Sequence, residues 1–337
     1  MPAADAHQHR RASAAAGHRM TTLRSAERQG PPRVGAYDLL AASSADSLAG
    51  EWVRLLRCRQ WVKNGFVIAP LLFSGRADDP WAIGRAALAF AAFCLLASGI
   101  YCWNDVVDRV ADRAHPAKRL RPVARGTIGV LSALLAGGVL TVGALAIGAF
   151  AGRALGIVLL AYLALNLAYW GWLKRVVLLD VFALAAFFVL RLLAGCAAIG
   201  VHPSIWLLLC GGLLSLYLGF AKRRHELELL GAGSVDHRSV LGSYDVPMLD
   251  QISTILLAVT VVAYVMYTLE SATAHVVGEE TLSYSTVFVL YGVLRYVFLV
   301  RRHEGGPPTE TLLADRPLLA AVIAWGAYCA WAVYRPF

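Results

Sequence analysis

Long apolar stretches alternate with polar connections from residue 54 to the C-terminus. Each stretch is about 18 to 25 residues long. A helix of about 20 residues crosses a hydrocarbon core of about 30 Å, so these lengths are typical of membrane spans. The pattern predicts an all-α integral membrane protein with nine transmembrane helices. The nine stretches cover residues 54–74, 81–104, 127–150, 152–172, 176–200, 204–221, 250–269, 283–300 and 316–334.

The first stretch and the region before it differ from the rest. Arg57, Arg59 and Lys63 interrupt the start of the first stretch, so we expect it to enter the membrane only from about Trp61. Residues 1–48 are rich in Ala, Ser, Arg, His and Gln and lack apolar periodicity. Such a composition does not bury enough apolar surface to fold. We therefore predict a disordered cytoplasmic tail over 1–48 and a membrane domain over 49–337.

Positive charge alternates between successive connections. The odd-numbered connections are poor in cations and contain Arg76, Arg85 and Arg153. By the positive-inside rule, the even-numbered connections and the N-terminus face the cytoplasm. We therefore expect a multi-pass protein of the plasma (inner) membrane whose polar chemistry lies on the cytoplasmic face. The even-numbered connections contain Arg109, Arg113, Lys118, Arg119, Arg121, Arg125, Lys174, Arg175, Lys222, Arg223, Arg224, Arg238, Arg301, Arg302 and Arg316.

Composition agrees with this interpretation. The chain is 58% hydrophobic and 16% charged, whereas a soluble domain has about 25% charged residues. A net charge of +9 would suggest nucleic acid in a soluble protein, but here the cations follow the membrane connections, so we expect lipid and no nucleic acid partner. The six cysteines form no C-x-x-C pair, which argues against a zinc site. The sequence leaves the oligomeric state open, a homo-oligomer included.

An acidic cluster stands at the cytoplasmic end of the second stretch. Asp105, Asp108 and Asp112 are spaced i, i+3 and i+7, so they share one face of a continuing helix, with Asn104 beside them. A single helix over 81–114 would be about 50 Å long and would project beyond the hydrocarbon. Three carboxylates on one face repel one another unless a cation lies between them. Mg²⁺ bound to a phosphate-bearing substrate would meet that need. The alternative is a solvated helix end with pairs such as Asp105–Arg109.

Polar residues outside the acidic cluster are candidates for binding the substrate. His115, Lys118, Arg119 and Arg121 follow the acids, and Arg and Lys suit phosphate oxygens, although such a run also suits anionic lipid headgroups. The polar residues at the start of the first stretch could instead serve only as a membrane anchor. Gln60 and Asn64, however, gain nothing from that role. Arg191 lies inside an apolar stretch, where a charge is costly unless it faces a polar interior. The other candidates are Arg59, Gln60, Lys63, Asn64, Tyr169, Lys174, Lys222, Arg223 and Glu226.

The acidic cluster also carries a family resemblance. The pattern Asn104-Asp105-x-x-Asp108-x-x-x-Asp112, followed by His115-Pro116-x-Lys118-x-x-Arg121-Pro122, resembles the first aspartate-rich motif of the UbiA superfamily of intramembrane prenyltransferases. The resemblance implies nine helices around a central cavity, with Asp105, Asp108 and Asp112 as Mg²⁺ ligands and catalytic residues. The segments 59–64, 66–75, 222–227 and 312–317 resemble one branch, the decaprenyl-phosphate phosphoribosyltransferases.

The chain departs from the wider superfamily at its second motif. Prenyltransferases of this kind usually carry D-x-x-x-D after the sixth helix, where this chain has Lys222-x-x-x-Glu226. The resemblance therefore implies transfer of 5-phosphoribosyl from phosphoribosyl diphosphate to decaprenyl or another polyprenyl phosphate, for cell-wall arabinan precursors. One alternative is a UbiA-type prenyltransferase that acts on an aromatic, quinone or haem precursor. A second is a non-enzymatic lipid-binding or transport protein.

Overall fold

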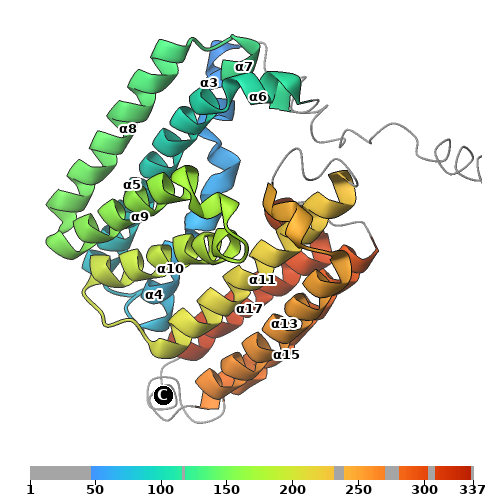
Figure 1. Ribbon diagram of the computed structural model, residues 1–337. Helices are drawn as coiled ribbons and strands as arrows, with labels where there is room; N and C mark the ends of the chain where they lie inside the picture. The colour runs from blue at the N-terminus through green and yellow to red at the C-terminus, as the bar shows by residue number, and fades with distance from the viewer. Residues whose placement is uncertain (1–46, 116–117, 231–238, 270–280, 303–307, 335–337) are drawn as a thin grey trace, which may run out of the picture.

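A computed structural model describes residues 47–115, 118–230, 239–269, 281–302 and 308–334 (Figure 1). These residues form helices joined by turns and short connections, and none of them is in a β-strand. The all-α fold class is therefore confirmed. The predicted tail over 1–48 lies outside the described residues, except for its last two positions. Ser47 caps the first described helix, because its side chain accepts a hydrogen bond from the backbone N–H of Gly50.

Eight helices in the described part of the chain are long and apolar enough to cross a membrane. Their positions follow the second to ninth predicted stretches closely. The protein is therefore a multi-pass membrane protein. The eight helices are α5 (Pro80–Val107), α8 (Val130–Ala151), α9 (Arg153–Gly171), α10 (Leu179–Ile199), α11 (Ile205–Leu230), α13 (Val246–Leu269), α15 (Thr286–Arg301) and α17 (Arg316–Tyr334).

The first predicted stretch is not one continuous helix. It is divided into α3 (Leu48–Leu56), a 3₁₀-helix η1 (Cys58–Val67) and α4 (Ala69–Phe73). Arg57 ends α3 in the left-handed region, with φ 52° and ψ 45°. A 3₁₀-helix of 10 residues is unusual, since such runs seldom exceed 3–4 residues. The predicted count of nine spanning helices is therefore not reproduced among the described residues, which contain eight.

The long helices form two groups (Figure 1). The first contains α5, α8, α9 and α10, and the second contains α11, α13, α15 and α17. Helix α10 joins the groups, because it packs against α5 and α9 of the first group and against α11 of the second. The remaining short elements are α6 (Arg109–Ala114), η2 (Lys118–Leu120), α7 (Pro122–Arg125), η3 (Leu173–Arg175), η5 (Ser239–Ser243), η6 (Thr281–Ser285) and α16 (Pro308–Ala314).

Glycine permits one close approach that positions η1. A Cβ atom on Gly195 of α10 would lie 2.1 Å from the carbonyl oxygen of Val67, a distance that no side chain tolerates. The absence of a side chain at Gly195 therefore lets the end of η1 lie directly against α10. This contact brings the polar residues of η1 next to the middle of α10.

The chain bends where α5 ends. We expected one helix over 81–114, but the helix ends at Val107, and α6 begins after a break at Asp108, where ψ is 0°. Arg113 of α6 donates a hydrogen bond from Nε to the carbonyl oxygen of Ala124 in α7, at 2.9 Å. Because α6 packs back onto α7, it does not continue the axis of α5. The prediction of a single helix was wrong at this point.

Candidate active site

Asp105 lies in the last turn of α5 and is almost completely buried, with 1% of its surface exposed. Its Oδ1 atom accepts hydrogen bonds from two arginines. Nη2 of Arg57 is 2.5 Å away and Nη1 of Arg121 is 3.4 Å away. A buried carboxylate is stable only when it is paired. The two guanidinium groups meet that requirement at Asp105.

Asp112 of α6 is also buried and shares one of these arginines. Nη1 of Arg121 lies 2.7 Å from Oδ2 of Asp112, so one cationic nitrogen bridges the carboxylates of α5 and α6. Asp108, in contrast, is exposed. Arg121 therefore joins Asp105 and Asp112, whereas Asp108 differs from both in its exposure to solvent.

The residues at this position fit a divalent cation. Carboxylate oxygens are the ligands that Mg²⁺ prefers. Two of them already converge on a single positively charged atom, Nη1 of Arg121, which occupies the place of a cation. Within the described ranges, no group of three His, Cys, Asp or Glu side chains is gathered into a ready-made metal site. A metal at Asp105 and Asp112 therefore requires Arg121 to move away.

Arg57 was not among the candidate binding residues. Leu55, two positions earlier, is fully buried in one apolar cluster with Cys102 and Val123, and this packing fixes the end of α3 beside α5. The Arg57 guanidinium lies over the ring of Tyr101, 4.6 Å from its centre. In the sequence, Arg57 was interpreted only as an interruption of the first apolar stretch. Its place at the start of the polar run 57–64 was the available signal.

The 3₁₀-helix η1 presents further polar side chains. Asn64 is buried, and its Oδ1 accepts a hydrogen bond from Nε of Arg191 at 2.8 Å. Lys63 is partly buried and lies outside the eight long helices. Burial, together with the positive charges of Arg191 and Arg57, lowers the pKa of Lys63 to about 8. A desolvated lysine beside two arginines favours an anionic ligand. Gln60 is partly buried and Arg59 is exposed.

The charge of Arg191, inside α10, is buried among neutral groups. Arg191 is 4% exposed, and besides Asn64 it donates hydrogen bonds to the carbonyl oxygen of Phe187 at 2.8 Å and to the hydroxyl of Tyr162 at 2.9 Å. Rings of Phe93, Tyr162 and Phe188 lie within 5.0 to 5.7 Å of its guanidinium carbon. Neutral acceptors and aromatic faces therefore stabilise this charge, and among the described residues it has no carboxylate partner.

On α11, the candidate residues Arg223 and Glu226 form ion pairs within the protein. Arg223 is fully buried, with Nε 2.7 Å from Oδ2 of Asp180 and Nη1 bonded to Glu226. The Tyr244 hydroxyl donates to Oδ1 of Asp180 at 3.2 Å. Of the Arg223 nitrogens, Nη2 is buried without a hydrogen-bond partner among the described residues. The structure thus places Arg223 and Glu226 together with Asp180, an acid that was not among the candidate site residues.

The remaining candidates lie on or beside α5, α6, α9, α11 and the short elements η2 and η3. Lys222 is exposed on α11. Tyr169, near the end of α9, packs edge to face against Phe187, with ring centres 5.9 Å apart. Nδ1 of His115 accepts a hydrogen bond from the backbone N–H of Lys118 at 3.3 Å. Asn104 and Lys174 are partly buried, and Arg119 is exposed.

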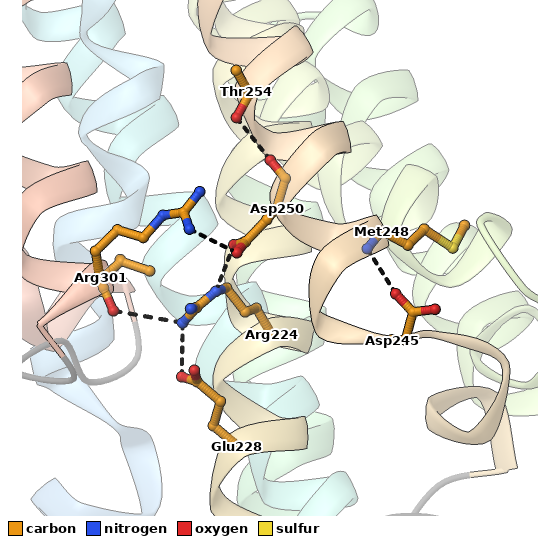
Figure 2. A network of polar contacts seen from close by, with 8 residues as sticks. Arg224, Glu228, Asp245, Met248, Asp250, Thr254 and Arg301 are labelled. Carbon is orange, nitrogen blue, oxygen red and sulfur yellow. Dashed lines mark hydrogen bonds and ion pairs between the residues drawn. The ribbon is translucent and has the colours of Figure 1, made fainter.

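A third polar network contains Asp250, and a separate hydrogen bond involves Asp245; neither acid was among the candidate site residues. Figure 2 shows Asp250 between Arg224 and Arg301, at 2.7 and 3.0 Å, and Arg224 also pairs with Glu228 at 2.7 Å. These contacts tie α11, α13 and α15 together. Asp245 caps α13, because its Oδ1 accepts a hydrogen bond from the backbone N–H of Met248 at 2.7 Å. Both acids therefore stabilise the fold.

Residues 65–315 match the model of the UbiA prenyltransferase family. The chain belongs to the UbiA prenyltransferase family. Other members that share its fold include a UbiA homolog from Archaeoglobus fulgidus bound to DMAPP and Mg²⁺. That structure superposes with a TM-score of 0.65 and 18% sequence identity, and the match covers 85% of this chain and 100% of the homolog. At this identity the likeness establishes the fold alone.

The chain is also similar to decaprenyl-phosphate phosphoribosyltransferases. The protein of Corynebacterium glutamicum is 35% identical over 298 residues, which cover 86% of this chain and 88% of the relative. The protein of Mycolicibacterium smegmatis is 32% identical over 303 residues, covering 87% of this chain and 95% of the relative. The similarity therefore extends through most of the membrane domain.

Proposed function

We propose that this chain transfers 5-phosphoribosyl from 5-phosphoribosyl diphosphate to a polyprenyl phosphate, decaprenyl phosphate in particular, and releases pyrophosphate. The observation that carries the proposal is the 32–35% identity with decaprenyl-phosphate phosphoribosyltransferases over at least 86% of this chain. The reaction takes place at the cytoplasmic face of the plasma membrane, where a soluble sugar donor is available. Its product serves as a precursor for cell-wall arabinan.

The acidic residues at the end of α5 are assigned to a divalent cation. Asp105, Asp108 and Asp112 would hold Mg²⁺, as the acid pair that converges on Arg121 supports. When bound, the metal would neutralise charge on the diphosphate group of the donor. The exposed position of Asp108 leaves its carboxylate accessible to a metal–diphosphate complex that arrives from solvent.

The cationic residues are assigned to the phosphate groups of the two substrates. Arg121 pairs with both Asp105 and Asp112, and Lys63 lies near Arg57 and Arg191. Lys118 and Arg119 are exposed on the connection that follows α6. A guanidinium offers a planar fork to phosphate oxygens, and an ammonium offers a point charge. Together with His115, Lys63, Lys118 and Arg119 are assigned to the ribose 5-phosphate and the lipid phosphate, and Arg121 lies where it can also reach the diphosphate on the metal. Arg59, Gln60, Asn104, Tyr169 and Lys174 complete the assigned surface.

The transfer itself demands little from side chains. The bond between the anomeric carbon and the pyrophosphate oxygen breaks, and a bond from that carbon to an oxygen of the lipid phosphate forms. The lipid phosphate is already anionic at neutral pH, so it needs no general base. The site must therefore orient the two substrates and stabilise the negative charge that develops on pyrophosphate.

The α11 cluster supports a ribosyl donor over a prenyl diphosphate. Where a second acidic pair would hold a second metal, this chain has the exposed Lys222, and its Glu226 is paired with Arg223. Glu226 is therefore compensated before any metal binds. A more basic second half suits substrates that together carry a diphosphate, a 5-phosphate and a lipid phosphate.

A labelled-transfer assay tests the proposed function. Purified protein, labelled 5-phosphoribosyl diphosphate, decaprenyl phosphate and Mg²⁺ are expected to yield a labelled lipid. Omission of Mg²⁺ and replacement of the acceptor by dephosphorylated decaprenol serve as controls, and both are expected to abolish the product. Transfer from a prenyl diphosphate to an aromatic acceptor, without ribosyl transfer, would identify the alternative UbiA reaction. Metal-independent lipid binding without turnover would point to a transport or scaffold protein.

A further inference from the structure

The two arginines at Asp105 differ from their partners in exposure. The side chains of Arg57 and Arg121 are 26% and 28% exposed, whereas those of Asp105 and Asp112 are 2% and 4% exposed. Each arginine therefore has one end of its guanidinium on a buried carboxylate, while part of its side chain remains open to solvent. Within the described part of the chain, the other guanidinium nitrogens of Arg57 and Arg121 have no hydrogen-bond partner.

The charges of this cluster balance as they stand. Two carboxylates face two guanidinium groups, so the group has no net charge at neutral pH. A divalent cation that enters between the carboxylates must compete with Arg121, whose Nη1 lies between them. With the metal in place and both arginines retained, the cluster carries two excess positive charges. An anion with several oxygens, such as a diphosphate, would restore the balance.

We propose that Arg57 and Arg121 are exchangeable partners of the metal-binding carboxylates. This inference rests on the proposed function. Without substrate they neutralise Asp105 and Asp112. When a divalent cation and a diphosphate enter together, the arginines release the carboxylates to the cation and bind phosphate oxygens. The exchange couples the two ligands, because the metal frees the arginines and the diphosphate retains them, so each ligand strengthens the binding of the other.

The surroundings of Arg57 suit a short movement. Its backbone is held in the left-handed region at the end of α3, and its guanidinium lies 4.6 Å from the centre of the Tyr101 ring. An aromatic face attracts a cation without consuming its N–H groups. The ring can therefore continue to hold the guanidinium while its hydrogen bonds pass from Asp105 to a phosphate.

Binding of Mn²⁺, measured by electron paramagnetic resonance on the full chain in detergent, tests the exchange. For the wild type we expect weak binding of Mn²⁺ alone and binding tighter by about 10-fold or more with inorganic pyrophosphate. In Arg57→Gln and in Arg121→Gln, Mn²⁺ alone is expected to bind more tightly than in the wild type, since a competitor is removed. The enhancement by pyrophosphate is expected to shrink about 10-fold. Arg125→Gln is the matched control, because Arg125 is exposed on the same connection and pairs with no described carboxylate.

The proposal is tested by whether the arginine variants bind Mn²⁺ more tightly or more weakly than the wild type. If the arginines only support the fold, their loss weakens or leaves unchanged the binding of Mn²⁺, and that result would overturn the proposal. Thermal unfolding monitors folding, and should Arg57→Gln not fold, Arg121→Gln carries the same test. The assay involves no sugar donor or lipid. A failed labelled-transfer assay with intact coupling between Mn²⁺ and pyrophosphate would therefore reject the proposed reaction and leave the exchange in place.

Discussion

Asp180 and Arg223 form an ion pair that is entirely removed from solvent. Oδ2 of Asp180 lies 2.7 Å from Nε of Arg223, and both side chains are 0% exposed. The pair joins the first turn of α10 to the end of α11, so it links the two groups of long helices near the candidate site. Tyr244, which precedes α13, adds a hydrogen bond to the same carboxylate.

Removal of Arg223 alone is expected to destabilise the protein strongly. Arg223→Met would leave the Asp180 carboxylate buried without its cation, which typically costs about 3–5 kcal/mol of unfolding free energy. The double variant Asp180→Asn, Arg223→Gln replaces the charges by neutral groups that can still hydrogen-bond, so it is expected to recover most of that loss. Denaturant unfolding in detergent would measure both values. Equal losses in the two variants would contradict this explanation.

The pair of Arg295 and Asp315 offers a comparison. Nη2 of Arg295 lies 2.8 Å from Oδ2 of Asp315, but the side chains are 28% and 14% exposed. This hydrogen bond holds the pKa of Asp315 below its usual range. Because solvent screens such a pair, Arg295→Gln is expected to cost about 1 kcal/mol or less in the same unfolding measurement. A loss as large as that of Arg223→Met would mean that exposure does not govern the strength of these pairs.

Substitution of Asp108 or of Asp105 is expected to abolish activity in both cases, but to affect the stability of the protein differently. Asp108→Asn should abolish ribosyl transfer yet change the unfolding free energy by no more than about 0.5 kcal/mol, because Asp108 is exposed. Asp105→Asn should abolish transfer and also lower stability, since it removes the partner of Arg57 and Arg121. Transfer assays beside thermal unfolding would show the difference. Full activity in either variant would mean that the metal ligands are assigned wrongly.

The protonation of Lys63 predicts a pH dependence. Its pKa is lowered to about 8, so the ammonium form dominates below that pH and the neutral form above it. Since the donor is anionic, kcat/KM for 5-phosphoribosyl diphosphate is expected to fall as the pH rises through about 8. Lys63→Arg keeps its charge throughout this range, so its profile should remain flat to about pH 9.5. An unchanged inflection in Lys63→Arg would assign the titration to another group.

Gly195 provides a test of how η1 is positioned. In Gly195→Ala the new Cβ would meet the carbonyl oxygen of Val67, so η1 must move away from α10. We expect a loss of about 1–3 kcal/mol in unfolding free energy and reduced transfer activity. Gly138→Ala on α8 is the control, because no atom lies within 4 Å of a Cβ there. It is expected to stabilise the helix slightly, by up to about 1 kcal/mol.

The broad architecture could be predicted from the sequence because the signal is local. Each long helix carries its own run of apolar residues, so α8 and α9 follow the predicted stretches to within a few residues. The prediction failed where neighbouring elements compete with local preference. Helix α5 ends at Val107 because α6 packs onto α7, and residues 48–73 break into three short elements beside α5 and α10.

For the site, the sequence by itself determined which residue types follow the apolar stretches and stand at the ends of the helices. The spacing of Asp105, Asp108 and Asp112 already pointed to a divalent cation. Only the tertiary structure decided their partners. Arg57 comes 48 positions before Asp105, and Arg223 comes 43 positions after Asp180, and no local pattern encodes such pairs. Each of these buried carboxylates is stable only when it is paired with an opposite charge. The packing of the helices determines which oppositely charged side chain lies close enough to form that pair.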